Sequence, residues 1–173
     1  MRGMNADVAR ELALQMGRPV RYGGEFRSLE ERVAYMVSIA EQALAPLVPE
    51  PKVGFKRYIR REPLGLVLVI APWNYPFLTA VNTIVPALIA GNAVLLKAAS
   101  QTILTGERFQ QALDRSGLPA GLFQNLVLDH EATARLIASG AIDHVTFTGS
   151  VAGGRAIERA AAGTFTSVAL ELG

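Results

Sequence analysis

Residues 64–77 read Leu-Gly-Leu-Val-Leu-Val-Ile-Ala-Pro-Trp-Asn-Tyr-Pro-Phe, and this stretch decides the fold. Residues 64–71 form a continuous apolar run, which is typical of a parallel strand covered on both faces of a sheet. The two prolines that follow restrict the backbone on either side of Trp73-Asn74-Tyr75, so the strand ends in a rigid turn. The stretch therefore predicts a buried strand with polar side chains held at its carboxyl end.

From this strand onward, apolar segments that suit strands alternate with segments that suit helices. Further strands are predicted at 93–96, 122–128, 144–148 and 167–172, and helices at 77–90, 105–116, 132–139 and 152–162. This alternation with right-handed crossovers predicts an α/β fold, a doubly wound, Rossmann-like parallel sheet of about five strands.

Amino-terminal helices are expected ahead of the sheet. Met4, Val8 and Leu12 recur at four-residue spacing, as on one face of a helix. Ser28, followed three residues later by Glu31, has the form of a capping box and predicts the start of a second helix. We interpret these helices as scaffold, because they carry no pattern that points to chemistry.

Composition excludes several classes of function. The 173 residues include no cysteine, so disulfides, thiolate metal sites and a cysteine nucleophile within the chain are excluded. The one dense basic run, within 52–61, lacks the interleaved aromatic stripe of a nucleic-acid surface, and a solvated strand edge explains it better. His130 and His144 have no partner at ligand spacing, so no metal site is predicted.

The stretch 77–96 is apolar enough to raise the question of a membrane span. Asn82, Pro86 and Gly91 interrupt it, and a buried helix, a turn and a strand explain it better. Residues 1–7 lack the apolar run of a signal peptide. We therefore expect no membrane association and a cytoplasmic location.

Polar residues follow the carboxyl ends of four predicted strands, where ligands collect in open α/β sheets. These residues are Asn74, Lys97, Ser150 and Glu171. Because parallel strands end at the same edge of a sheet, the sequence predicts a binding site there.

Each of these residues has two interpretations. Asn74 could donate a hydrogen bond to a developing oxyanion or only complete the turn. Lys97 could bind a ribose hydroxyl or a phosphate, or only extend into water. The glycine-rich stretch 149–154 could let a pyrophosphate approach a helix N-terminus, while Ser150 could only cap that helix. Glu171 could be a general base or an exposed carboxylate.

Together these stretches resemble the aldehyde dehydrogenase family. The resemblance rests on Ile-Ala-Pro-Trp-Asn-Tyr-Pro-Phe at 70–77, Gly-Leu-Pro-Ala-Gly-Leu-Phe at 117–123, Phe-Thr-Gly-Ser at 147–150 and Glu-Leu-Gly at 171–173. It covers nearly the whole chain, from about Met4 onward. It implies an oxidoreductase that oxidises an aldehyde to a carboxylic acid with NAD or NADP.

The resemblance also implies roles for single residues. Asn74 would stabilise the oxyanion, and Glu171 would activate the water that releases the acid. At the position of Ser100 the family often has an acidic residue, which repels a 2′-phosphate; serine removes that repulsion, so NADP should be tolerated. Cofactor contacts are implied at Ile70, Ala71, Pro72, Trp73, Asn74, Lys97, Ser100, Gly121, Gly149, Ser150, Gly154 and Leu172.

The family's nucleophile is a cysteine beyond the glutamate, and this chain has no cysteine. We therefore expect residues 1–51 to form an amino-terminal helical segment and residues 52–173 a partial NAD(P)-binding domain that lacks the cysteine-bearing part. The chain alone is expected to be inactive. The alternative is a non-catalytic dinucleotide-binding or assembly fragment of a truncated gene. A small-molecule aldehyde and a homo-oligomeric full-length form are the implied partners.

Overall fold

A five-stranded parallel sheet forms the centre of the computed structural model, which describes residues 1–173 apart from the side chain of Arg2. The order in the sheet is β3-β2-β1-β4-β5, and each neighbouring pair is parallel. This confirms the predicted doubly wound sheet, although β3 is shorter than predicted. The strands are β1 (Leu66–Ile70), β2 (Ala93–Lys97), β3 (Phe123–Asn125), β4 (His144–Gly149) and β5 (Ser167–Leu172).

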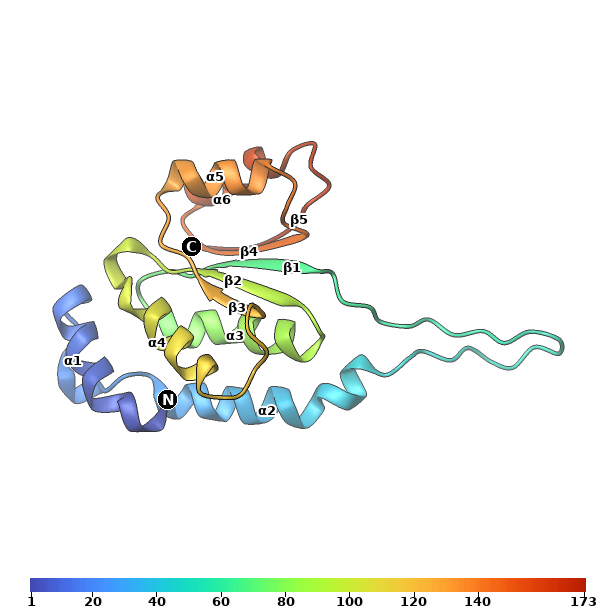
Figure 1. The fold of residues 1–173 in the computed structure, drawn as a ribbon, viewed down its shortest axis with the longest axis horizontal. Coiled ribbons are helices and arrows are strands. Elements are labelled where there is room, and N and C mark those ends of the chain that lie inside the picture. Colours follow the sequence, from blue (N-terminus) through green and yellow to red (C-terminus); the bar gives the residue numbers. More distant parts are fainter.

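Helices cover both faces of the sheet (Figure 1). On one side lie α1 (Asn5–Met16), α2 (Phe26–Leu44), α3 (Pro76–Ile89) and α4 (Leu104–Asp114), and on the other lie α5 (His130–Ala138) and α6 (Val151–Ala161). The apolar stretch 77–96 falls on α3, a turn and β2, as predicted. Among the described residues, no helix combines the length and apolarity needed to cross a bilayer.

The continuous apolar run of β1 supplies both faces of the sheet. Val67 and Val69 belong to the core cluster that α1 to α4 complete, whereas Leu68 and Ile70 belong to the cluster beneath α5 and α6. Alternate residues of a strand point to opposite faces, so a strand buried on both faces needs an apolar side chain at every position.

The amino-terminal helices share the first of these clusters. Val8, Leu12 and Phe26 pack in the same core as Phe77 of α3. The rings of Phe26 and Phe77 lie 5.5 Å apart between centroids. The division into residues 1–51 and 52–173 stays a prediction, since one core contains side chains from both parts.

The predicted capping box at Ser28 is wrong. Helix α2 begins at Phe26, and its N-cap residue is Glu25, which has a φ of 69° and makes no side-chain cap. Ser28 therefore lies inside the first turn of the helix. The reason is tertiary, because the carboxylate of Glu25 is engaged by another segment, as described below.

Between α2 and β1 the chain leaves the body as a long arm, residues 45–65 (Figure 1). Leu47 and Ile59 face each other in an antiparallel bridge and exchange N–H···O hydrogen bonds of 2.9 and 2.8 Å. The arm turns at its tip, where the N–H of Phe55 donates to the carbonyl of Lys52 at 3.0 Å. The basic run at 52–61 lies on this exposed arm.

The shared core predicts that α1 stabilises the whole fold. Leu12 is 1% exposed, whereas Leu14 of the same helix is 88% exposed. We expect Leu12→Ala to lower the free energy of unfolding by about 2–5 kcal/mol, since it leaves a cavity in the core. Leu14→Ala is the matched control and should change it by less than about 0.5 kcal/mol. Urea unfolding followed by circular dichroism measures both, and equal effects would contradict the shared core.

Candidate functional site

The ends of four strands lie side by side along the carboxyl edge of the sheet. Ile70 of β1 pairs in register with Lys97 of β2 on one side and with Phe147 of β4 on the other, and Phe147 pairs with Leu170 of β5. From β1 the chain continues to β2 and β3 on one side of the sheet, and it then crosses to β4 and β5 on the other side of β1. The end of β1 is therefore a topological switch point, where open α/β sheets bind ligands.

The turn after β1 presents Trp73 and Asn74 to solvent. The N–H of Ala71 still donates to the carbonyl of Lys97 at 3.1 Å, so the start of the turn continues the pairing with β2. Asn74 uses its Oδ1 to accept the N–H of Tyr75 at 3.1 Å. Within the described residues no hydrogen bond occupies its Nδ2. The side chain thus helps to form the turn and keeps an N–H donor free.

Lys97 is buried, although the chain leaves the sheet at this point. Only 5% of the residue is exposed, so the stem of the side chain is covered, and the terminal Nζ is the part that keeps contact with solvent. Burial lowers the pKa of Lys97, and the carboxylate of Asp129 partly opposes this shift. No described residue forms a hydrogen bond or ion pair with its Nζ. An ammonium that is largely desolvated and has no protein acceptor suits a hydroxyl or phosphate ligand, whose oxygen would accept its hydrogen bonds.

The glycines at 149–154 have a packing role as well. A Cβ added to Gly149 or Gly153 would lie 2.7 or 2.5 Å from the ring of Phe147, and one added to Gly154 would lie 2.7 Å from Leu172. Ser150 is the N-cap of α6, and its Oγ accepts the N–H of Gly153 at 3.1 Å. The capping interpretation is therefore confirmed. The helix still directs its positive N-terminal end toward the carboxyl edge of the sheet.

Glu171 and Leu172 close the other end of the site. They pair in register with Thr148 and Gly149 of β4, and the N–H of Gly173 donates to the carbonyl of Gly149 at 3.2 Å. Both side chains are exposed on β5, which lies at the edge of the sheet. Glu171 is thus an exposed carboxylate in this structure, and its role as a general base stays a prediction.

Two further residues from the sequence analysis have different positions. Ser100 is exposed and begins a short 3-10 helix (Ser100–Thr102) after β2, on the side of the site. Gly121 precedes β3, next to Leu122, whose carbonyl accepts the N–H of Val94 near the start of β2. Gly121 therefore lies at the amino edge of the sheet, and the structure does not bring it together with the other residues.

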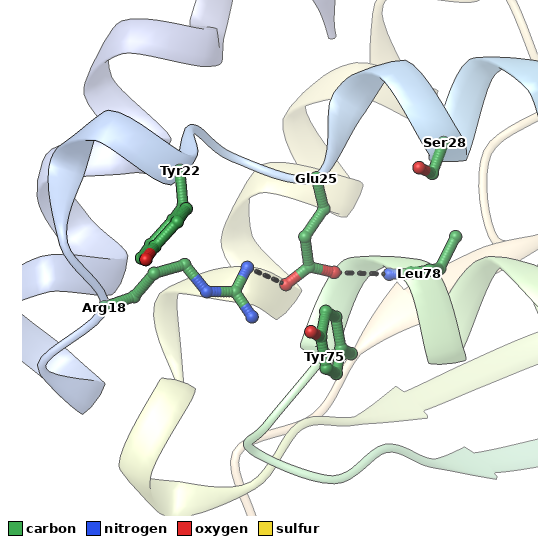
Figure 2. Close-up of a pocket in the computed structure, with 6 residues that line it drawn as sticks. All are labelled: Arg18, Tyr22, Glu25, Ser28, Tyr75 and Leu78. Carbon is green, nitrogen blue, oxygen red and sulfur yellow. Dashed lines mark hydrogen bonds and ion pairs between the residues drawn. The ribbon is translucent and has the colours of Figure 1, made fainter.

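A cluster of side chains that the sequence analysis missed lies next to Tyr75, in the turn after β1 (Figure 2). The guanidinium of Arg18 forms an ion pair of 2.5 Å with Glu25 and donates to the backbone carbonyl of Asn74 at 2.6 Å. The second carboxylate oxygen of Glu25 accepts the N–H of Leu78 at 2.8 Å. The cluster borders a cavity of about 380 Å³, which is lined by Arg18, Tyr22, Glu25, Ser28, Tyr75 and Leu78.

Burial raises the pKa of Glu25, although the N–H of Leu78 and the guanidinium of Arg18 oppose the shift. The side chains of Arg18 and Glu25 are only 11% and 4% exposed. The only sequence signal for this cluster is a charged residue placed directly after Gly23-Gly24. Its significance depends on contacts with residues more than fifty positions away.

Comparisons with known proteins agree with this geometry. The sequence profile of the aldehyde dehydrogenase family matches residues 1–173. Geranial dehydrogenase of Castellaniella defragrans is 34% identical over 168 residues, which cover 96% of this chain and 35% of that protein. The chain thus spans about a third of the length of the curated relatives that it matches first.

Solved structures of the same family superpose on the whole fold. Succinic semialdehyde dehydrogenase of Streptococcus pyogenes, in complex with NADP+, has a TM-score of 0.85 at 26% identity and covers 97% of this chain and 37% of its own. A double mutant of betaine aldehyde dehydrogenase from Staphylococcus aureus, in complex with NAD+, has a TM-score of 0.87 at 27% identity and covers 99% of this chain and 35% of its own.

The raised pKa of Glu25 predicts a pH dependence of stability. The folded state binds this proton more tightly than the unfolded chain, whose pKa is near 4.5. The stabilisation from Glu25 is therefore complete below pH 4.5 and is lost as the pH rises through the raised pKa. Urea unfolding over this range should give a free energy difference, wild type minus Glu25→Gln, that falls with increasing pH. A difference that stays constant or rises would contradict the prediction.

Proposed function

The chain belongs to the aldehyde dehydrogenase family, and on that premise we propose that it binds NAD or NADP at the carboxyl edge of its sheet. In the complete protein this site would serve the oxidation of a small aldehyde to a carboxylic acid. The observation that carries the proposal is the alignment of Lys97, the turn at 73–74 and the N-terminus of α6 at one switch point. Relatives crystallised with NADP+ and with NAD+ support the same choice of ligand.

Each group in the site suits a part of a dinucleotide. The largely desolvated ammonium of Lys97 would bind a ribose hydroxyl or a phosphate oxygen, because its Nζ lacks an acceptor among the described residues. The first turn of α6 offers backbone N–H groups to a pyrophosphate. The exposed indole of Trp73 lies at the same edge, where it would report on a bound ligand.

A bound nicotinamide dinucleotide would supply the hydride acceptor for the oxidation of the substrate carbon. This chain would contribute the free Nδ2 of Asn74 as the donor to the substrate oxyanion, and Glu171 as the base that activates water. It has no cysteine, so no thioester can form on it.

We expect the purified 173-residue chain to produce no NAD(P)H from an aldehyde, because the thiol that would form the thioester is absent. An absorbance assay at 340 nm measures this product, and NAD(P)H formation in that assay would contradict the prediction.

The alternative function is a non-catalytic dinucleotide-binding or assembly fragment. The cysteine-free sequence favours it, because binding needs only the edge of the sheet, whereas acyl transfer needs a thiol from elsewhere. A longer reading frame with a cysteine after Glu171 would support the enzyme. A stop codon directly after Gly173 would support the fragment.

Dinucleotide titration tests the proposed site. Trp73 is the only tryptophan in the sequence, so its fluorescence reports on the turn after β1. We expect NAD+ and NADP+ to quench it in a saturable way, and Lys97→Met to weaken binding about tenfold or more through loss of a charge-assisted hydrogen bond. Lys56→Met, on the exposed arm, is the matched control. Absence of saturable quenching in the wild type, or equal effects of both variants, would contradict the site.

The proposed tolerance of NADP depends on Ser100. A carboxylate at this exposed position would repel a 2′-phosphate but could accept hydrogen bonds from a 2′-hydroxyl. We expect Ser100→Glu to lower the affinity for NADP+ relative to NAD+ by about tenfold. Ser100→Gln introduces a side chain of the same size as glutamate but without the charge. It should leave the ratio of the NADP+ and NAD+ affinities within about twofold of the wild-type ratio. The same fluorescence titration measures both variants, and an unchanged ratio for Ser100→Glu would contradict the assignment.

We also propose that the protein forms a homo-oligomer through the arm at 45–65. A two-stranded arm buries little of its own apolar surface. Val53 at its tip is 99% exposed, and Leu47, Val48, Phe55 and Ile59 are exposed as well. An apolar surface of this kind is typical of a contact with another chain. A second copy of the protein is the partner that the implied homo-oligomer requires.

This assembly predicts a specific effect of charge on the arm. We expect the wild-type chain to elute as a dimer or larger species in size-exclusion chromatography with light scattering. Val53→Lys combined with Phe55→Lys should shift it toward the monomer, because lysine is costly to bury in an apolar contact. Leu14→Lys combined with Val20→Lys introduces the same two charges at exposed apolar positions outside the arm and is the control. A monomeric wild type would contradict the proposal.

A further inference from the structure

Arg18 and Asn74 bind opposite ends of one peptide group. The Nη2 of Arg18 donates to the carbonyl of Asn74 at 2.6 Å, and the N–H of the same peptide, that of Tyr75, donates to the Oδ1 of Asn74 at 3.1 Å. Because a peptide group is planar and rigid, a contact that holds its oxygen also fixes its N–H. The positive guanidinium also polarises the peptide, which strengthens the N–H as a donor.

Glu25 holds the other end of the same turn. One carboxylate oxygen binds the Nη1 of Arg18 at 2.5 Å, and the other accepts the N–H of Leu78 at 2.8 Å. Leu78 is in the first turn of α3, whose N-cap residue Tyr75 supplies no side-chain hydrogen bond. Glu25 therefore provides from another segment the acceptor that an N-cap side chain normally provides. The Cζ of Arg18 also lies 4.9 Å from the centroid of the Tyr75 ring, so the guanidinium makes a cation–π contact with the same turn.

The energetics of this pair are unfavourable for a purely structural element. The pKa of Glu25 is raised, so desolvation of its carboxylate outweighs its hydrogen bonds. Glu25 also has a φ of 69°, in the left-handed region that residues other than glycine rarely adopt. Buried ion pairs are often no better for stability than apolar side chains of similar size. Backbone strain and a buried charge at one residue are typical of a functional constraint.

We propose that Arg18 and Glu25 are positioning residues for Asn74. They hold the peptide group between Asn74 and Tyr75 in one orientation. The side-chain amide of Asn74 is bound to the N–H of this peptide through its Oδ1, so its free Nδ2 is also kept in a fixed direction. The proposal rests on the proposed function only for the use made of that Nδ2. It assigns to the junction between α1 and α2 a direct role in the precision of the oxyanion donor.

The sequence allows this peptide group to be observed alone. Asn74-Tyr75 is the only Asn-Tyr step in the chain. Labelling with carbonyl-13C asparagine and 15N tyrosine therefore gives a single peak in an HNCO spectrum, that of the Tyr75 amide. We expect Arg18→Met to move this peak and to accelerate exchange of the Tyr75 amide proton with water about tenfold or more, relative to core amides. Arg18→Lys should have a similar effect, because a lysine cannot reproduce the planar two-pronged contact.

Arg108→Met is the matched control. Arg108 of α4 forms a partly buried ion pair with Glu11 of α1, whose Nε–Oε2 contact is 3.1 Å. This variant also removes an ion pair of the amino-terminal segment but leaves the turn at 74–78 untouched. A general loosening of the fold would accelerate exchange alike in Arg108→Met and Arg18→Met. Faster exchange of the Tyr75 amide proton in Arg18→Met but not in Arg108→Met therefore shows that Arg18 holds this peptide group in place, because loss of the direct contact alone would move the peak without loosening the turn.

Glu25→Gln provides an independent test if Arg18→Met does not fold. It keeps an acceptor for the N–H of Leu78 but removes the charge that anchors Arg18, so the Tyr75 peak should again move. The proposal is overturned if folded Arg18→Lys and Glu25→Gln leave the peak and its exchange rate unchanged, or if Arg108→Met changes them equally. All spectra are recorded without dinucleotide. A negative result here therefore does not contradict the proposed dinucleotide binding. In the same way, a protein that fails to bind dinucleotide would not change the interpretation of these spectra.

Discussion

The parallel pairing of β1 with β2 and β4 is the constraint on which the rest of the structure depends. It places Ile70 between Lys97 and Phe147, so that three chain segments far apart in sequence end at one edge. It also requires β1 to be apolar on both faces, which accounts for the unbroken run before Pro72. Since both faces are covered by helices, the edge at the strand ends is where polar groups of these segments can meet a ligand.

A second constraint acts from the opposite end of the chain. The junction between α1 and α2 brings Arg18 and Glu25 against the turn that carries Asn74. The amino-terminal helices are therefore more than a cover for the core, because their connection determines how one peptide group in the site is oriented. The same helices supply Leu12 and Phe26 to the core, so packing and positioning depend on a single docking of this segment.

The periodic parts of the fold could be predicted, because hydrophobic pattern is a local property. All five strands and the helices between them lie where the pattern places them, with β3 shortened. The start of α2 was missed because Ser28 and Glu31 match a capping box, while the real N-cap, Glu25, is engaged by Leu78. The burial of Lys97 was equally invisible, since a strand end does not reveal which helices cover it.

The sequence by itself determined the α/β class, the order of the elements and the strand ends that carry polar residues. The absence of cysteine also determined that none of these residues can supply a thiol nucleophile. Only the tertiary structure decided that Lys97 is buried, that Gly121 lies at the opposite edge, and that Arg18 reaches the carbonyl of Asn74. The physical reason is distance along the chain: periodicity records the environment of neighbouring residues, whereas these contacts join segments that meet only once the sheet and its helices have packed.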